Sequence, residues 1–511
     1  MARPAAHCCG PDRISSLTDT KNHAASTPPG PWWDRVAFGG LLLALVWAPL
    51  PLGSNRPWAV GVLASLLCLL VALYLLGAVH GGHARFRGRL LAAAWSLGLM
   101  GCFALLLLGQ LSAPAWLQAP LHTMDAFQTR IYLLTTLAYL AAALLVALCV
   151  GTARRVTLLL VAVLAAGVLQ AVIAVALYSA GASYQYLFTD FAQGGRVTGT
   201  FVNPDHLAGY LELCLSAGLG LMLAQFGGGQ QQVRGWRQKV VSALTFMLSA
   251  KMLLRLMLVV MVVALVMTHS RMGNGAFFLA LLLVGGLVAV VSRRLRRPAL
   301  WLVASMALVD LVIIGQWVGL DRVVERLQDT AESSVLDASA PTAPGIISST
   351  ALGVIAPLHR EDSIQERLRV PVLSLPLVAQ QPWFGHGGGT YFLSLPAIKP
   401  AGFPHLWDHA HNDYVEVAVD TGWVGLALLL ALATATAWRA LRMLSDSAPR
   451  LNRGVGAAAL TALSCMGLHS LVDFNLQIPA NAITLVVLLA LVWITPMSAT
   501  LPAGAAAPRR R

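Results

Sequence analysis

Residues 156–178 have the sequence VTLLLVAVLAAGVLQAVIAVALY, a run of 23 residues without a charged side chain. A helix needs about 20 predominantly apolar residues to cross the hydrocarbon core of a bilayer, so this run predicts a membrane span. Similar runs begin near Val36, Trp58, Leu90, Ile131, His206, Met252, Gly275, Ala299, Tyr414, Gly454 and Pro479. The sequence therefore predicts an all-α polytopic membrane protein with about twelve transmembrane helices.

The composition of the whole chain agrees with this class. Of its 511 residues, 57% are hydrophobic and 11% are charged, and the mean hydropathy is +0.70. Soluble proteins have about 25% charged residues, so an ordinary soluble protein is excluded. The first 30 residues lack the apolar core of a signal peptide, and we expect the first span to remain in the mature protein.

The positive charges predict the orientation. With the N-terminal tail in the cytoplasm, 25 of the 35 Lys and Arg residues lie in cytoplasmic segments and 10 lie on the other side, as the positive-inside rule requires. We therefore predict a multi-pass membrane protein with both termini cytoplasmic. The net charge of +13 is then explained by contact with anionic membrane lipids, and nucleic acid is excluded as a partner.

These assignments divide the chain into five segments. They are a disordered cytoplasmic tail (1–34), transmembrane helices 1–9 (35–319), a long periplasmic loop (320–410), transmembrane helices 10–12 (411–497) and a basic cytoplasmic tail (498–511). Loops of this length between rigid elements usually carry function.

Arginines on the predicted outer face are candidates for binding an anion. Arg196 precedes Asn203 and Pro204, a pair typical of a helix start in which the asparagine oxygen caps free N–H groups. Arg271 lies in a tight turn between two spans. Each arginine either anchors the chain at the lipid headgroups or faces an anionic substrate. Because short outer loops hold so few basic residues, we expect Arg271 to have a specific partner.

Histidines at the end of the long loop are candidates for proton transfer. His405, His409 and His411 fall within seven residues and precede Asn412 and a span. Their neighbours are a poor set of zinc ligands, so we expect no metal. A helix N-terminus disfavours imidazolium, which keeps a histidine there neutral and able to accept a proton near pH 7.

Two more segments each have two interpretations. The glycine-rich run 385–389 either lets a ligand approach the backbone or forms a tight turn. His469 and Asp473 are four residues apart and so share one helical face. Ionisable groups at membrane depth are functional by default, but they also form polar clasps between helices.

These motifs resemble the O-antigen ligase and O-antigen polymerase superfamily of bacterial envelope glycan transferases. His411, Asn412, Gly422 and Gly425 match the ligase pattern of histidine, a polar residue, nine residues, glycine, two residues and glycine. Leu426 and Ala427 replace the two threonines that follow in that pattern.

Other positions strengthen the resemblance. Arg271, and Arg367 ahead of the segment 382–389, resemble the family's two essential arginines, and the segments 198–203 and 469–474 are similar to its polymerase-like members. The resemblance covers about residues 35–497 and implies a GT-C-like fold.

What the resemblance implies is a glycosyltransferase of polysaccharide or lipopolysaccharide biosynthesis with its active site facing the periplasm. It implies metal-independent, inverting transfer, without a cofactor, of an undecaprenyl-pyrophosphate-linked glycan to a hydroxyl of the lipid A core or a growing polysaccharide chain. His411 would remove the acceptor proton, and Arg271, Arg367 and Arg196 would bind the pyrophosphate. The supporting residues would be His409, Asn412, Asn203, His469 and Asp473.

Several alternatives remain open at the level of sequence. Within the enzyme class they are a repeat-unit polymerase of an exopolysaccharide or O-antigen and a protein O-oligosaccharyltransferase. From another class, a lipid-glycan flippase or transporter also has many spans and a few outer arginines. Transporters tend to contain internal repeats, and no clear repeat is present here, although Asp310 is a candidate midplane charge.

Overall fold

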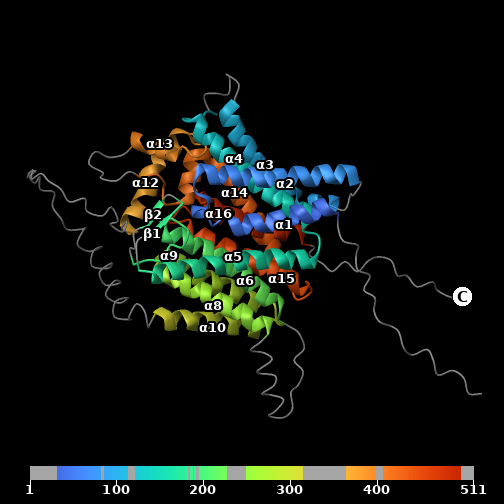
Figure 1. The fold of residues 1–511 in the computed structure, drawn as a ribbon. Coiled ribbons are helices and arrows are strands. Elements are labelled where there is room, and N and C mark those ends of the chain that lie inside the picture. The colour runs from blue at the N-terminus through green and yellow to red at the C-terminus, as the bar shows by residue number, and fades with distance from the viewer. Residues whose placement is uncertain are drawn as a thin grey trace, which may run out of the picture.

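The computed structural model describes residues 31–81, 86–112, 121–181, 184–187, 189–191, 195–226, 249–314, 364–398 and 407–495. Most of these residues form helices that lie side by side in a bundle (Figure 1). The helices are α1 (Trp32–Trp47), α2 (Pro57–Gly81), α3 (Arg87–Ser112), α4 (Ala126–Cys149), α5 (Ala153–Ser179), α6 (Pro204–Ala224), α8 (Ala250–Met267), α9 (Arg271–Val291), α10 (Arg296–Ile314), α12 (Ile364–Gln380), α13 (Tyr391–Ser394), α14 (Asp413–Met443), α15 (Arg450–His469) and α16 (Pro479–Ile494).

Short elements complete the described structure. The 3-10 helices are η1 (Leu52–Ser54), η3 (Leu395–Ala397) and η4 (Asn475–Gln477). Strands β1 (Tyr184–Tyr186) and β2 (Thr189–Phe191) pair antiparallel, and the sequence did not predict them. The predicted loop 320–410 contains α12, α13 and η3, so its second half is largely helical. His405 lies outside the described residues.

Among the described residues, seven helices are long and apolar enough to cross a membrane, namely α2, α3, α4, α5, α6, α9 and α14. The predicted class of a helical, multi-pass membrane protein is therefore confirmed. Helices α1, α8, α10, α15 and α16 lie at the five other positions where the sequence predicts spans. A full count of twelve crossings stays a prediction.

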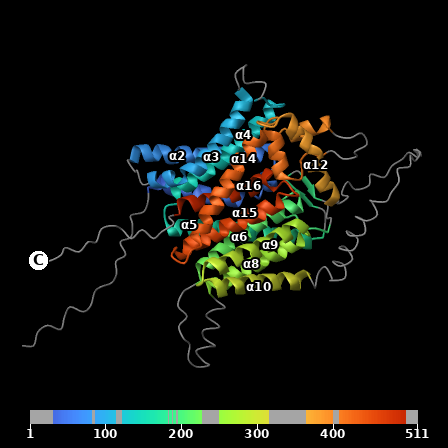
Figure 2. The same cartoon turned by 180° about the vertical axis from the view of Figure 1, so that it is seen from behind.

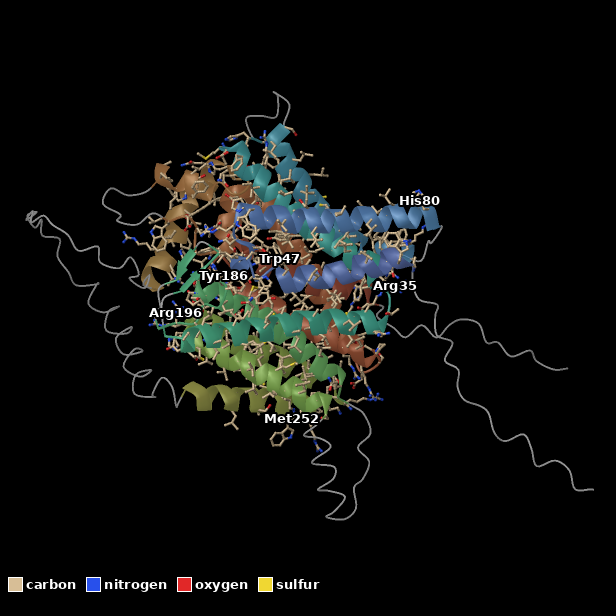
Figure 3. All side chains as sticks on the ribbon, in the orientation of Figure 1. Arg35, Trp47, His80, Tyr186, Arg196 and Met252 are labelled. Carbon is tan, nitrogen blue, oxygen red and sulfur yellow. The ribbon has the colours of Figure 1, made fainter. Side chains whose placement is uncertain are left out.

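The two ends of the bundle carry different elements. Tyr186 and Arg196 lie at one end, and Arg35 and His80 lie at the other (Figure 3). Helix α12 is at the end that holds Arg196, as the view from behind also shows (Figure 2). Side chains that the predicted topology assigns to opposite faces of the membrane thus lie at opposite ends of the bundle.

Helix α6 forms the centre of the bundle. Every residue from Asp205 to Leu223 is buried, and α15 makes its most extensive packing against this helix. The two backbones meet at Gly220 and Gly454, where a Cβ added to either glycine would collide with the carbonyl of the other. Small residues at such crossings let membrane helices approach closely, so α6 and α15 form a rigid pair.

Three arginines of the predicted cytoplasmic side bind the C-terminal ends of helices. Arg89 donates from Nε to the carbonyl of Ala147 in α4 at 2.8 Å, and Arg155 donates to the last carbonyl of the same helix. Arg439 donates in the same way to the carbonyl of Val492 in α16 at 2.8 Å. The last carbonyls of a helix lack partners and carry partial negative charge. These arginines therefore stabilise the bundle as well as marking its orientation.

Helix α14 is kinked at Gly422, whose φ is +65°. At the kink the N–H groups of Trp423 and Val424 donate to the carbonyls of Pro382 and Trp383, at 2.8 and 3.2 Å. A side chain at Gly422 would collide with the backbone of Trp383, and glycine tolerates the left-handed conformation. The kink thus fixes the segment that follows α12 directly against the helix that begins beside His411.

Candidate active site

The site forms around Asp205, in the first turn of α6. Asn203 caps this helix by accepting a hydrogen bond from the N–H of Asp205 at 2.8 Å, and Pro204 occupies the first helical position. The predicted helix start is therefore confirmed. A carboxylate in the first turn is stabilised by the partial positive charge of the helix N-terminus, which places a buried anion at the predicted outer end of the bundle.

Arg196 and Arg367 both pair with this carboxylate. Arg196 donates from Nη2 to Oδ1 of Asp205 at 2.6 Å, and Arg367 donates from Nη2 to Oδ2 at 2.9 Å. The two arginines come from the segment before α6 and from α12, so the fold brings them together from distant parts of the chain. Arg196 also donates from Nε to the carbonyl of Thr268 at 2.9 Å, which holds it against the turn before α9.

Arg271 begins α9 in that same turn. Ser270 caps the helix by accepting from the N–H of Gly273 at 3.1 Å, and His269 has a φ of +53°. The Arg271 side chain is exposed, and within the described part of the chain it has no ion-pair partner. It is therefore available to a ligand, three residues from the carbonyl that holds Arg196.

His411 lies just before α14 in a buried position. Its φ is +50°, and its ring makes edge contacts with Trp407 and Phe474 at centroid distances of 5.0 and 5.1 Å. Burial lowers the pKa of His411 to about 4, opposed by the negative charge of Asp473 and helped by the positive charge of Arg367. The ring is thus neutral near pH 7, as the sequence predicts, although burial rather than the helix terminus is the main cause.

Asp473 lies among three histidines. Its carboxylate oxygens are 3.8 Å from Nε2 of His206, 4.0 Å from Nδ1 of His411 and 3.7 Å from Nε2 of His469. None of these three nitrogens has a hydrogen-bond partner among the described residues. Because α15 ends at His469, the prediction that His469 and Asp473 share one helical face is wrong, but the two residues are close and belong to a larger buried cluster that includes His411.

On its other side, His469 is paired with a second acid. Its Nδ1 lies 2.9 Å from Oε1 of Glu212 in α6, and both side chains are fully buried. The sequence patterns did not indicate Glu212, Asp205 or His206 as site residues. An acidic residue within an apolar run is the signal that could have found Glu212, but its partner, 257 residues away, has no local signature.

His409 has a different electrostatic environment from His411. Its Nδ1 lies 2.7 Å from Oε1 of Glu416, and its ring stacks on Phe474 at 3.9 Å. Burial by itself lowers the pKa of His409, but the negative charge and hydrogen bond of Glu416 outweigh burial and raise that pKa to about 9. His409 is therefore an imidazolium near pH 7 and is unsuited to accept a proton.

Asn412 is the N-cap of α14. It accepts from the N–H of Val415 at 3.0 Å and donates from its amide to the carbonyl of Leu471 at 2.9 Å. Next to it, the N–H of Asp413 donates to the carbonyl of Ser470 at 3.0 Å. These bonds join the start of α14 to the end of α15, so Asn412 holds His411 in place beside Asp473.

The glycine-rich run is occupied by contacts within the protein. The N–H groups of Gly387 and Gly389 donate to the backbone and side chain of Asp420 at 3.0 and 2.8 Å, and that of Gly388 donates to Oε1 of Gln110 at 3.0 Å. Of the two interpretations, this favours a tight packed turn over backbone contact with a ligand.

Metal-binding geometry is absent from the described ranges, because no three His, Cys, Asp or Glu side chains there converge as a metal would require. The cluster around Asp473 consequently offers hydrogen-bonding and proton-accepting groups. The expectation that no metal takes part stays a prediction.

Comparison with known proteins identifies the class of protein that this fold and site define. Residues 256–430 match the family described as O-antigen ligase, a segment that contains Arg271, Arg367, His409, His411 and Asn412. This match confirms the predicted resemblance to the O-antigen ligase superfamily over residues 256–430. It supports a membrane glycan ligase or polymerase of the glycosyltransferase type. No curated protein matches the chain.

Proposed function

We propose that this protein transfers a glycan from undecaprenyl pyrophosphate to an acceptor hydroxyl at the periplasmic face of the bacterial inner membrane. The observation that carries the proposal is the position of His411. Its imidazole is buried and neutral, and it is close enough to Arg367 for the charge of that arginine to help lower its pKa. A proton acceptor thus lies beside a group of cations, which is the combination that this transfer needs.

The reaction would proceed by direct displacement. His411 takes the proton of the acceptor hydroxyl while the hydroxyl oxygen attacks the anomeric carbon of the donor. The bond from that carbon to the pyrophosphate oxygen breaks, and undecaprenyl pyrophosphate leaves with inversion of configuration. Because Nδ1 of His411 faces Asp473 at 4.0 Å, Nε2 is the ring nitrogen left for the acceptor proton.

The arginines would neutralise the leaving group. Pyrophosphate is already a good leaving group, so the site needs positive charge more than a strong acid, and the planar guanidinium suits phosphate oxygens. Arg196 and Arg367 share the carboxylate of Asp205, and Arg271 has no ion-pair partner among the described residues. A pyrophosphate diester carries two negative charges, which these guanidinium groups would neutralise without a metal or cofactor.

The remaining residues would position these groups. Asn203 and Asn412 cap the helices that present Asp205 and His411. His409, held as an imidazolium by Glu416, would orient the acceptor, and His469 and Asp473 would orient the ring of His411.

A reconstituted assay with purified lipid-linked donor tests the proposal. We expect His411→Ala to lower the rate by about 10²–10⁴-fold, as loss of a general base does. We expect Arg271→Ala to lower it by about 10²–10³-fold, as loss of one charge-stabilising donor does. Matched controls are His80→Ala, at the opposite end of the bundle, and Arg130→Ala, an exposed arginine of α4. If His411→Ala or Arg271→Ala kept near wild-type turnover, the role proposed for that residue would be wrong.

Two further readouts separate the alternatives. Release of free undecaprenyl pyrophosphate from donor plus acceptor indicates a transferase, because a flippase releases none. Activity that EDTA abolishes and Zn²⁺ or Mg²⁺ restores would contradict the metal-independent mechanism. In a deletion strain, single-repeat products indicate a polymerase, and uncapped lipid A core beside intact polymer indicates a ligase.

A further inference from the structure

Helix α12 lies across the predicted outer end of the bundle rather than along it. In two opposite views the spans α5 and α6 lie side by side, and α12 runs across their ends (Figure 1 and Figure 2). Because the spans follow the membrane normal, a helix in this direction lies close to the plane of the membrane. Helices that bind the membrane surface lie in that plane, with one face in the headgroup region.

An apolar stripe follows the exposed side of α12. It consists of Leu368, Val372, Leu375, Pro376, Ala379 and, just after the helix, Trp383. These positions are three, four or seven residues apart, so they form one helical face. Leu368, Val372 and Leu375 are 53, 64 and 53% exposed, and Trp383 is 66% exposed. We call these six residues the α12 stripe.

The opposite side of α12 is apolar as well, but it is buried in the protein. Val370, Leu377 and Val378 belong to a small core that also contains Ala418 and Val419 of α14. A helix that lies between a protein core and water turns polar residues to the water. Since α12 is apolar on the side away from the core, that side is better suited to lipid than to water.

Polar residues border the α12 stripe along one edge. Arg369 and Gln380 are exposed, and at about 100° per residue they both lie roughly 60–80° round the helix from Val372. The exposed side therefore changes from apolar to polar across its width. This pattern is typical of a helix whose apolar face enters the acyl boundary of a bilayer while its polar edge meets headgroups and water.

The end of the α12 stripe is joined to the lipid-facing side of a membrane span. Trp423, Leu430 and Trp438 of α14 are 52, 45 and 58% exposed, and their spacing of seven and eight residues places them on one face. Because α14 is a candidate span, this face contacts lipid. The N–H of Val424 donates to the carbonyl of Trp383 at 3.2 Å, which fixes Trp383 beside Trp423.

Tryptophans on α14 locate the two surfaces of the bilayer. Tryptophan is enriched at the headgroup level of membranes. The guanidinium of Arg442 lies over the ring of Trp438 at 4.8 Å, as expected at the cytoplasmic surface, where arginines reach toward headgroups. Trp423 and its neighbour Trp383 then mark the outer surface. Helix α12, which ends just before Trp383, is therefore at the level of the outer headgroups.

From these observations we propose that α12 is docked on the outer leaflet of the bilayer through the α12 stripe. Its partner is the lipid surface, with the apolar side chains in the upper acyl region and Arg369 and Gln380 at the headgroups. Arg367 is on the same helix and pairs with Asp205, so lipid contact also holds this ion pair in place. Docking of α12 is a binding property and does not depend on the transfer reaction.

Quenching from the lipid and from the water tests the docking. A fluorescent amino acid is introduced at position 372 of the full chain by amber suppression, and the protein is reconstituted into nanodiscs that hold a single copy. We expect strong quenching by phospholipids that carry bromine on the upper acyl chain, and protection from iodide in solution. Position 380, on the polar edge of the same helix, is the matched control, and its lipid quenching should be several-fold weaker.

Lipid quenching that is no stronger at position 372 than at position 380 would overturn the proposal. If iodide then quenches position 372, the α12 stripe faces water. If neither agent quenches it, another protein surface covers the stripe.

A charge placed in the α12 stripe gives the second test. With the fluorescent residue at position 375, Val372→Asp should reduce lipid quenching several-fold, because a carboxylate is costly to bury in the acyl region. Gln380→Asp, on the polar edge, should leave the quenching unchanged. Size-exclusion elution and Tm show whether each variant is folded. Unchanged quenching in folded Val372→Asp would contradict docking, and the comparison of positions 372 and 380 decides the matter if that variant does not fold.

Discussion

Arg367 and Asp205 lie 162 residues apart in the sequence and form an ion pair of 2.9 Å between Nη2 and Oδ2. The pair joins α12 to the first turn of α6, and Arg196 reaches the other oxygen of the same carboxylate. Asp205 therefore sets the spacing of two arginines before any substrate arrives. Such preorganisation lowers the cost of binding an anion in the correct geometry.

We predict that these two residues are energetically coupled. In a double-mutant cycle of Arg367→Gln and Asp205→Asn, the coupling in the free energy of unfolding should be roughly 0.5–3 kcal/mol, as for other contacting residues. Denaturant unfolding in detergent measures it. As a control, the changes in the free energy of unfolding should be additive when Arg130→Gln replaces Arg367→Gln in the cycle. Additive changes for Arg367 and Asp205 would show that their contact does not hold Arg367 in place.

The pH dependence of transfer should follow His411. A general base acts only when deprotonated, and burial lowers the pKa of His411 to about 4. The value of kcat/KM should therefore rise as the pH rises through about 4 and be level near 6.5, where an ordinary histidine titrates. Arg367→Gln removes a positive charge that lowers this pKa, so it should move the acid limb to higher pH. An acid limb at 6.5 in the wild type would contradict the buried neutral base.

The stability of the protein should depend on the pair of His409 and Glu416 at alkaline pH. Their interaction raises the pKa of His409 to about 9, above the unfolded value of about 6.5. The stabilisation is therefore fully present below pH 6.5 and is lost as the pH rises through about 9. The Tm of the wild type should fall over this interval, whereas that of Glu416→Gln should change little. Parallel curves for the two proteins would contradict the pairing.

Gly422→Ala should destabilise the site. Its φ of +65° disfavours a side chain, and the new Cβ would collide with the backbone of Trp383. We expect a lower Tm and loss of transfer, because the segment after α12 can no longer dock into the kink of α14. Gly286→Ala in α9 is the control, since its Cβ meets open space and alanine favours a helix by about 1 kcal/mol. Equal Tm values for the two variants would argue against a fixed kink.

The pair of Glu212 and His469 should behave as a structural clasp. Glu212→Ala leaves a buried imidazole without its partner and should cost about 3–5 kcal/mol of unfolding free energy. The double variant Glu212→Leu with His469→Phe should regain most of that stability, because apolar replacements often substitute for buried ion pairs. Transfer activity should recover only in part, because His469→Phe also removes an imidazole that lies 3.7 Å from Asp473, the acid beside His411. A stable double variant with wild-type activity would show that His469 does not orient His411.

Much of the fold could be predicted from the sequence because the signal for a membrane helix is local. A run such as 156–178 satisfies its own backbone hydrogen bonds and transfers apolar side chains to lipid whatever its neighbours are, and α5 follows that run. The same holds for the caps Asn203 and Asn412, which bond to N–H groups two or three residues away. The strands β1 and β2, in contrast, are too short to leave a periodic pattern.

Only some residues of the candidate site could be predicted from the sequence. Arg271, Arg367 and His411 could be named because they fall in recognisable motifs, but the acids that organise the site could not. Asp205 belongs to the site because it pairs with arginines from two other segments. Glu212 belongs to it because it pairs with a histidine on α15. No local pattern encodes such pairs, since each partner contributes a single residue.

By itself, the sequence determined where the helices lie, how charge is divided between the ends of the bundle and which family the chain resembles. These properties depend on burial and backbone hydrogen bonding within one segment. Only the tertiary structure decided that Asp205 joins two arginines, that His411 is neutral while His409 is charged, and that an apolar side of α12 stays exposed across the end of the bundle. These depend on which side chains meet across helices, because desolvation and Coulomb interactions are set by distance in space rather than by position in the chain.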